Sequence, residues 1–306
     1  MVAALALTGA TGFVGQAVLD DAGCRGLPVR ALTRRPQAEH PGVTWVAGDL
    51  SDSAALAELM QGASAVLHIA ALTTAREADA FERANVAGTQ AVLAAAKTAG
   101  VRRFVFVSSL SAREPALSMY GASKARAEQL VAASGLDWTI VRPPGVYGPR
   151  DVDYLEMFRT ARRGFVPLPP RGASSLIHVE DLARLLLDLA AAPLGRVRHQ
   201  LYEPDDGREG GWSHRELAEM IGAAVGRRVV APHLPAPLLR LAARWDGLVR
   251  GDKARLTPDR VGYLTHPNWV ARSHFAVPGD LWRPAIDSRD GFARTAAWYR
   301  EHGLLR

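Results

Sequence analysis

The feature that most restricts the fold is a regular alternation of short apolar runs and helical stretches over the first 145 residues. Helical stretches are expected over 53–61, 76–99 and 118–134. Six runs have the length and composition of strands buried on both faces, as in a parallel sheet: "ALALT", "LPVRALTRR", "VTWVAGDL", "ASAVLHIAAL", "RRFVFVSSLSA" and "LDWTIVRPPGVYG". The alternation predicts an α/β fold, a doubly wound parallel sheet that binds ligands at the carboxyl ends of its strands.

The first apolar run leads into a glycine-rich turn, "TGATGFVG", with glycines three residues apart and a helix beginning near Gly12. Glycines let the backbone approach a pyrophosphate closely, and a helix N-terminus offers free N–H groups and partial positive charge. A tight turn without a ligand would use the same glycines, so this motif alone leaves both interpretations open. If the turn binds a dinucleotide, the contacts expected in it are Gly9, Thr11, Gly12, Phe13, Val14 and Gly15.

The end of the second apolar run indicates which dinucleotide is bound. A carboxylate at this point usually holds the ribose 2′-hydroxyl of NAD, whereas an arginine suits the 2′-phosphate of NADP. "RALTRRPQ" offers Arg34 and Arg35 and no acid, which favours NADP(H), with Arg34 the better candidate. The alternatives are NAD(H), and two solvated arginines in a turn. In "AGDL", Asp49 is a candidate to accept from the adenine amino group with Leu50 packed nearby; a turn or helix-capping aspartate is its alternative.

The pattern changes after Tyr147, where prolines and glycines become frequent and the elements are short and mixed. We expect 1–150, with returns near 174–204, to form the dinucleotide-binding domain, and 151–173 and 205–306 to form a smaller substrate-binding lobe. Within that lobe, "APHLPAPLLRLAARWDGLVRG" looks amphipathic and basic. It is expected to cover a substrate pocket or to pack in the lobe, and contact with a membrane surface is the alternative.

Composition argues against several classes of protein. No run of about 18–20 apolar residues occurs, so no transmembrane helix is expected. The amino terminus shows no signal peptide, and the single cysteine, Cys24, fits a reducing compartment, so a cytoplasmic enzyme is expected. The net charge of +6 is spread along the chain without basic runs interleaved with aromatics, which argues against nucleic acid. No cysteine or histidine cluster has metal-binding spacing.

Tyr120 and Lys124, in "SMYGASKARAEQL", lie one helical turn apart and therefore on one face of the predicted helix. A phenol with the ordinary pKa of about 10 is a poor acid–base group at neutral pH unless a nearby positive charge favours the phenolate. The preceding strand ends in serines, of which Ser109 is best placed to hold a carbonyl or hydroxyl beside the phenol, with Ser108 and Ser111 as competitors. Taken alone, Tyr120 and Lys124 would also fit an ordinary helix surface.

With these motifs in order, the chain resembles an extended short-chain dehydrogenase/reductase over essentially its whole length. The resemblance implies a Rossmann domain and an NAD(P)-dependent enzyme. The stretches that carry it are the glycines of 9–15, "GDL" at 48–50, "HIAAL" at 68–72, "NVAGT" at 85–89, the strand-end serines, Tyr120 and Lys124, "RPPGVYGP" at 142–149 and "IHVEDLA" at 177–183.

The resemblance also implies roles for single residues. Tyr120 would be the catalytic acid–base, Lys124 would lower its pKa and bind the nicotinamide ribose, and Ser109 would orient the substrate. Asn85 would support the active site from the long helix. Many relatives pair this helix, near 76–99, with the helix that carries Tyr120, so the resemblance allows a homodimer; packing of the alanine-rich faces on the sheet is the alternative. The residues that would line the cofactor path or meet the nicotinamide carboxamide are Ala70, Ala71, Pro143 and Val146.

Two branches of this family compete for the function. Sugar-nucleotide members often place an arginine just before the "IHV" segment to grip the diphosphate. This chain has Ser174 and Ser175 there, although Arg171 and Arg150 are nearby. The C-terminal stretches "LPAPLLRLAARW" and "WRPAIDSRDGFARTAAWYREHGLL" resemble the reductase and hydroxysteroid-dehydrogenase-like branch.

We therefore expect an NADP(H)-dependent oxidoreductase, a carbonyl reductase or alcohol dehydrogenase, acting on a small apolar or amphipathic substrate. The first alternative is an NAD(P)-dependent sugar-nucleotide epimerase or dehydratase. The second is a non-catalytic NADP-binding assembly or regulatory protein, although such chains commonly lose the tyrosine or the lysine and this chain keeps both.

Overall fold

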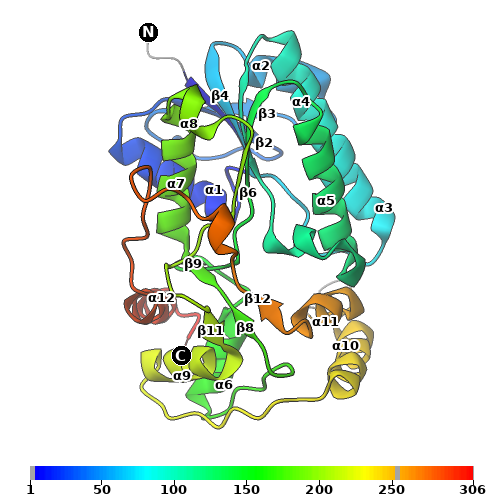
Figure 1. Cartoon of the computed structure of the whole chain (residues 1–306), viewed down its shortest axis with the longest axis vertical. Helices are drawn as coiled ribbons and strands as arrows, with labels where there is room; N and C mark the ends of the chain where they lie inside the picture. The colour runs from blue at the N-terminus through cyan, green and yellow to red at the C-terminus, as the bar shows by residue number, and fades with distance from the viewer. Residues whose placement is uncertain (1–3, 252–255, 306) are drawn as a thin grey trace. The chain divides into compact units, whose positions relative to one another are not determined.

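The structure, a computed structural model, describes residues 4–251 and 256–305 (Figure 1). The chain divides into two compact units. The first runs to Arg142 and includes Leu182–Tyr202 and Gly279–Trp282. The second comprises Pro143–Asp181, the described residues of Glu203–Pro278 and those from Arg283 onward.

The first unit is built on a seven-stranded sheet with the order β10-β6-β5-β4-β1-β2-β3. Every neighbouring pair in this sheet is parallel, which confirms the predicted doubly wound α/β fold. Central strands are almost wholly buried, which explains why they are continuous apolar runs and not alternating ones. The strands are β1 (Ala4–Thr8), β2 (Val29–Thr33), β3 (Val43–Ala47), β4 (Ala63–His68), β5 (Arg103–Val107), β6 (Asp137–Val141) and β10 (Gln200–Tyr202).

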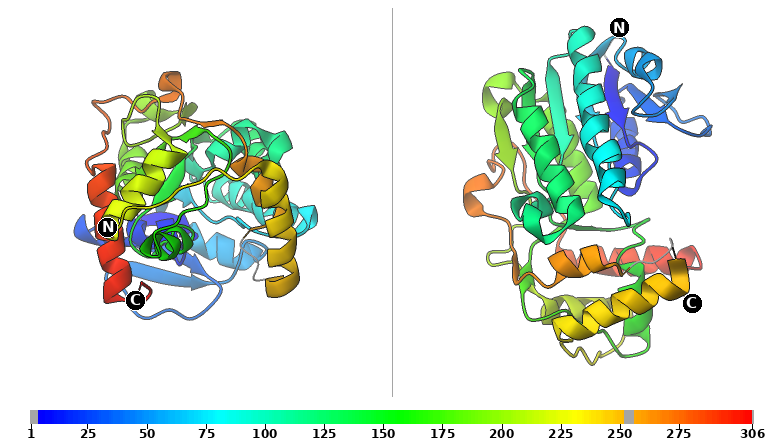
Figure 2. Two further views of the ribbon diagram at one scale, coloured as in Figure 1. Left: turned by 90° about the horizontal axis from the view of Figure 1, so that it is seen from below. Right: turned by 90° about the vertical axis from the view of Figure 1, so that its right-hand side faces the viewer.

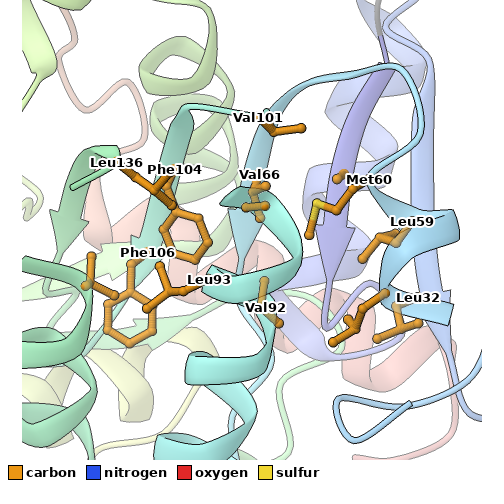
Figure 3. Packing of buried hydrophobic residues seen from close by; sticks show 14 of the residues in the cluster. Leu32, Leu59, Met60, Val66, Val92, Leu93, Val101, Phe104, Phe106 and Leu136 are labelled. Carbon is orange, nitrogen blue, oxygen red and sulfur yellow. The ribbon is translucent and has the colours of Figure 1, made fainter. Parts of the chain in front are cut away.

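Helices cover both faces of this sheet (Figure 1). On one face, α2 (Ser53–Leu59), α4 (Gly88–Thr98) and α5 (Met119–Ala132) enclose the main core, in which Phe104 and Phe106 are fully buried (Figure 3). On the other lie α1 (Phe13–Cys24) and α7 (Val179–Ala191), joined by an ion pair of 2.6 Å between Arg25 and Asp188. The shorter helical segments are α3 (Ala78–Phe81), the 3₁₀ turns η2 (Leu110–Arg113) and η3 (Pro115–Leu117), and α8 (Leu194–Val197).

The helix predicted over 76–99 is not a continuous α-helix. A π-helical turn, η1 (Glu82–Ala87), separates α3 from α4, and the Gly88 N–H donates to the carbonyl of Arg83, five residues earlier. Such wide turns change the rotation of the residues that follow and are frequent at functional sites. Asn85, one of the predicted site residues, lies within this turn.

The second unit contains two small sheets and a separate core. The prolines after β6 carry no backbone N–H, and beyond them β7 (Gly145–Tyr147) pairs in parallel with β9 (Leu176–His178). The region near 174–204 was predicted to return to the dinucleotide-binding domain. In the structure, most of α7 and β10 belong to the first unit, whereas β9 belongs to the second. The other sheet has the order β11-β8-β12, formed by β11 (Trp212–Ser213), β8 (Ala173–Ser174) and β12 (Asn268–Trp269).

The core of the second unit is centred on stacked aromatic rings. The ring centroids of Tyr147 and Phe292 are 4.1 Å apart at an interplanar angle of 5°, and Tyr147 donates to Ser288 at 3.1 Å. Helices α10 and α11 lie side by side and share a small cluster of their own (Figure 2). The helical segments are α6 (Leu155–Arg162), α9 (His214–Ala224), α10 (Ala236–Arg250), α11 (Pro258–Leu264), η5 (Ser273–Phe275) and α12 (Ser288–Glu301).

No helix within residues 4–251 and 256–305 has both the length and the apolar composition needed to cross a membrane. The longest of those in the second unit, α10, spans 15 residues and carries arginines.

Candidate active site

The glycine-rich turn between β1 and α1 is shaped for close backbone contact. Gly9 has a φ of +80°, and a Cβ on it would stand 2.6 Å from the backbone nitrogen of Ala70. A Cβ on Gly15 would stand 2.0 Å from the Gly9 carbonyl oxygen, so α1 can pack against the turn only with glycine there. Gly12, the N-cap of α1, provides no side-chain cap for the first N–H groups. These features fit a pyrophosphate. Of the other predicted contacts, Thr11 is exposed and Phe13 and Val14 are half-buried.

The ends of β2 and β3 carry the residues predicted to bind the adenosine ribose and base. Thr33 Oγ1 donates to the carbonyl oxygen of Arg35 at 2.7 Å, and this tight turn leaves the side chains of Arg34 and Arg35 exposed. Asp49 Oδ1 accepts from the hydroxyl of Ser51 at 2.6 Å and from its N–H at 2.8 Å. These bonds, with a smaller contribution from the charge of Arg34, hold the pKa of Asp49 below its usual value. Asp49 therefore takes part in a turn and lies within electrostatic reach of Arg34.

Leu50, predicted to pack near the adenine, contacts the start of helix α4. A Cβ on Gly88, the first residue of α4, would stand 2.8 Å from Leu50 Cδ1, so the absence of a side chain there makes room for the leucine. Leu50 also packs against the main core. Its position is thus determined by packing inside the first unit.

Asn85 connects the loop after β4 to helix α5. Its Oδ1 accepts from the Leu72 N–H at 2.7 Å, and its Nδ2 donates to the Leu72 carbonyl at 2.9 Å. Nδ2 also donates to Ser123 Oγ at 2.9 Å, and that hydroxyl donates to the Tyr120 carbonyl at 2.7 Å. Asn85 is only 2% exposed. The predicted supporting residue thus ties the loop to the backbone that carries Tyr120.

A second chain of buried hydrogen bonds runs through His68. Thr89 Oγ1 donates to the Asn85 carbonyl at 2.6 Å, so in its 3.0 Å contact with His68 Nε2 it accepts. His68 Nδ1 then accepts from the Thr8 hydroxyl at 2.6 Å, and Thr8 Oγ1 accepts from the Ala70 N–H at 3.3 Å. Burial lowers the pKa of His68 to about 3, so the imidazole is neutral, as this chain of donors and acceptors requires.

The three serines after β5 have different partners. The Ser108 hydroxyl donates to Glu128 Oε1 at 2.5 Å, and the same carboxylate forms a 2.6 Å ion pair with Arg142. Ser111 is buried and its hydroxyl donates to Ser109 Oγ at 3.0 Å. Ser109 is half-buried, and its Oγ also accepts from the Ser111 N–H at 3.2 Å. The Ser108 and Ser111 hydroxyls thus donate their hydrogen bonds, whereas Ser109 Oγ accepts both of its bonds with the described residues. The O–H of Ser109 is therefore left to donate to a ligand.

Lys124 is a buried cation in helix α5, with 1% of its surface exposed. Its Nζ donates to the Val107 carbonyl at 2.7 Å and lies 4.3 Å from the centroid of the Phe106 ring. Burial lowers the pKa of Lys124 to about 7, although the Glu128 carboxylate acts in the opposite direction. The ammonium is therefore held at the end of β5, the strand that leads to the serines.

Tyr120 lies at the start of α5, where the helix approaches the serine segment closely. Ser118 is the N-cap, and its Oγ accepts from the Gly121 N–H at 2.9 Å. A Cβ on Gly121 would stand 2.6 Å from the Ser111 carbonyl oxygen, so glycine at this position permits the approach. Tyr120 is half-buried, with its ring centroid 6.2 Å from that of Phe81.

The first unit alone therefore connects Asn85, Tyr120 and Lys124 with the serine segment through short contacts. Ala71 is exposed in the loop after β4. Pro143 and Val146 belong to the second unit, where Pro143 is buried and Val146 is half-buried in β7. Their contact with a nicotinamide stays a prediction.

Several residues that hold the site together had no predicted role: His68, Ser123 and the pair of Glu128 with Arg142. Two of them left a weak signal in the sequence. His68 is a polar residue at the end of the apolar strand "ASAVLH", and Ser123 directly precedes Lys124. Arg142 opens the stretch "RPPGVYGP", but its pairing with Glu128 left no signal, because the burial of these two side chains appears only in the fold.

Comparison with known proteins gives a consistent result. The chain matches, over residues 9–193, a family model described as NAD(P)H-binding. It is 36% identical to a protein named ceramide reductase from Caulobacter vibrioides, with 98% of this chain and 96% of that protein covered. It is 32% identical to 4-hydroxy-2-methyl-3-oxo-4-farnesyl-3,4-dihydroquinoline-1-oxide ketoreductase from Stigmatella aurantiaca, with 85% and 92% covered. The solved structure of MoeE5 in complex with UDP-glucose and NAD shares the fold, with a TM-score of 0.75, 24% identity and coverage of 98% and 99%.

Proposed function

Because the chain belongs to the extended short-chain dehydrogenase/reductase family of NAD(P)-dependent oxidoreductases, we propose that it is an NADP(H)-dependent carbonyl reductase with a Ser109, Tyr120 and Lys124 site. The observation that carries the proposal is the buried Lys124 ammonium one helical turn from Tyr120, on a helix that contacts the serine segment. A positive charge there favours the phenolate form of the tyrosine, which suits the phenol to proton transfer near neutral pH.

In the proposed reaction, the protein residues position the carbonyl and move one proton. NADPH, when bound, would supply a hydride to the carbonyl carbon. Ser109 donates a hydrogen bond to the carbonyl oxygen, and Tyr120 transfers its phenolic proton to the same oxygen, so that the product is an alcohol. The Lys124 ammonium stabilises the phenolate left behind until a proton returns. General acid catalysis of this kind contributes about 10²–10⁴-fold in rate.

The substrate class proposed is an apolar or amphipathic carbonyl compound. The names of both relatives support it, since one is a reductase named for ceramide, a lipid, and the other a ketoreductase whose substrate name includes a farnesyl chain. Hydrocarbon chains contribute binding energy in proportion to the apolar area that leaves water. A longer chain on the ketone is therefore expected to improve binding.

The second unit provides little support for a sugar nucleotide. Ser174 and Ser175 stand where members of that branch often place an arginine for the diphosphate. Ser175 is fully buried and its hydroxyl donates to Asp205 Oδ2 at 2.7 Å. Burial raises the pKa of Asp205, and in its ionised form this carboxylate would repel a diphosphate. The reductase function is therefore preferred over epimerisation.

Turnover of methyl ketones of increasing chain length tests the proposed function. With NADPH in excess, we expect loss of absorbance at the nicotinamide band, alcohol formed in equal amount, and a kcat/KM that increases with chain length. UDP-glucose supplied in parallel should be left unchanged. Epimerisation of UDP-glucose without net NADPH consumption would contradict the proposal. So would protein that binds NADPH and reduces none of the ketones.

Arg34 is proposed to bind the 2′-phosphate of NADP(H). Replacing Arg34 with Ala should weaken NADPH binding roughly 10- to 100-fold, the usual value of a hydrogen bond to a charged group, and leave NADH binding unchanged. Titration of cofactor-stripped protein by tryptophan fluorescence measures both affinities. Arg35→Ala, also exposed, serves as the control and should have the smaller effect. Equal losses for NADPH and NADH would exclude this role.

A further inference from the structure

Helix α10 presents a continuous apolar surface to solvent. Counted from the first of these positions, its exposed apolar residues recur at i, i+3, i+7, i+10 and i+11, so they share one face of the helix. Large apolar side chains gathered in this way are uncommon on protein surfaces and mark sites of interaction. The α10 stripe consists of Leu238, Leu241, Trp245, Leu248 and Val249, which are 52%, 51%, 61%, 78% and 76% exposed, respectively.

The stripe faces away from the side by which α10 is attached. Leu239 and Ala243 are the buried apolar residues of this helix, and they pack with Val261 of α11. At about 100° per residue, their side of the helix is roughly 150° from the centre of the stripe. The α10 stripe therefore does not belong to the small α10–α11 core.

The charges beside the stripe have one dominant sign. Arg240 and Arg244 are exposed and lie one turn apart, Arg244 at about 90° and Arg240 at about 130° from the centre of the stripe. Arg250 pairs with Asp246 at 3.3 Å, and Asp246 is the one carboxylate in the helix sequence. The helix thus has a positive flank, in a chain whose net charge is +6. A partner that covers it must be apolar where the stripe lies and negative at its edge.

We propose that α10 is an interfacial helix that binds the surface of a bilayer containing anionic lipid. Leucines and a tryptophan on one face and arginines beside them are the pattern by which helices lie in the interface, with the apolar side chains among acyl chains and the arginines near phosphates. An antiparallel pair of α10 helices from two copies of this chain fits less well, because a two-fold axis perpendicular to both helices would bring their positive flanks together. Helix α10 alone would account for this binding. The further consequence, that the enzyme reaches an apolar substrate in the membrane, rests on the proposed function.

Co-sedimentation with vesicles tests the proposal without any need for turnover. We expect the wild type to bind vesicles of phosphatidylcholine with phosphatidylglycerol, and to bind pure phosphatidylcholine more weakly. Replacing Trp245 and Leu248 together with Gln should lower binding at least about tenfold, because most of the inserted area is lost. Neutralising Arg240 or Arg244 with Gln should cost about fivefold each on anionic vesicles only. Leu194→Gln, a matched change at a 45% exposed leucine of α8, should bind as the wild type does.

Three results would overturn the proposal. The first is vesicle binding by the Trp245 and Leu248 double variant equal to that of the wild type. The second is a wild type that ignores vesicles but sediments as a dimer that this variant dissociates, which would identify a second copy as the occupant. The third is loss of kcat/KM for a freely soluble ketone in the same variant, which would make α10 a cover for the substrate. If no ketone is reduced, the proposed function fails while the vesicle result stands.

Discussion

A Tyr120→Phe variant should bind NADPH as tightly as the wild type and retain only about 10⁻² to 10⁻⁴ of its kcat. The substitution removes one hydroxyl and leaves the ring, whose centroid is 6.2 Å from that of Phe81, in place. The hydrogen bond that ties this position to Ser123 goes to the backbone carbonyl of Tyr120 and therefore survives. Single-turnover measurements with bound NADPH would separate loss of the chemical step from loss of binding.

Tyr202→Phe is the matched control in the same unit. The Tyr202 hydroxyl donates to the Arg196 carbonyl at 3.3 Å, so its removal should cost about 1 kcal/mol of stability and leave kcat unchanged. A Tyr120→Phe enzyme that kept kcat within a few-fold of the wild type would show that another group supplies the proton. Equal losses in the two variants would point to a structural effect.

Replacing Lys124 with Met should abolish most turnover and yet stabilise the cofactor-free protein at neutral pH. In the folded state burial lowers the pKa of Lys124 from 10.5 to about 7. Between these two pH values the unfolded chain binds the proton that the folded chain lacks, so wild-type stability increases with pH across this interval. Below pH 7 the full cost of burying the charge is present, on the order of a few kcal/mol. Methionine has similar length and no charge to bury.

Denaturant unfolding at several pH values measures this effect. The free energy of unfolding of Lys124→Met should exceed that of the wild type most at pH 7 and below, and the difference should shrink toward pH 10.5. Lys97→Met, at an exposed lysine near the end of α4, should show no such pH-dependent difference from the wild type. A Lys124→Met protein less stable than the wild type at pH 7 would mean that the bond to the Val107 carbonyl outweighs the cost of burial.

The apolar runs were sufficient to predict the parallel sheet, because strands that are apolar on both faces are typical of parallel sheets covered by helices on each side. The helical stretch predicted over 76–99 is helical over 78–98, but its middle is the π-helical turn η1 around Asn85 and not a regular α-helical turn. The side chain of Asn85 in this turn bonds to both backbone groups of Leu72, in a loop that the helix pattern does not describe.

The residues of the candidate site could be predicted where they belong to one motif. They could not be predicted where they interact with residues far away in the sequence. Tyr120 and Lys124 share a helix, so their spacing was enough. The choice among the serines needed Glu128, twenty residues later, and the His68 chain joins Thr8 to a position sixty residues away. The roles of the site residues, the preference for NADP(H), the homodimer and the cytoplasmic location remain predictions.

The pairing of Asn85 with the loop after β4 is also expected to affect the entropy of cofactor binding, because Ala70 and Ala71 of this loop are predicted to line the cofactor path. Both backbone groups of Leu72 are already hydrogen-bonded to this one buried side chain in the free protein. A segment that is already ordered loses little conformational freedom when a ligand arrives, so more of the contact energy contributes to affinity. Folding itself has thus met part of the entropic cost that a mobile loop would impose on each molecule of cofactor bound.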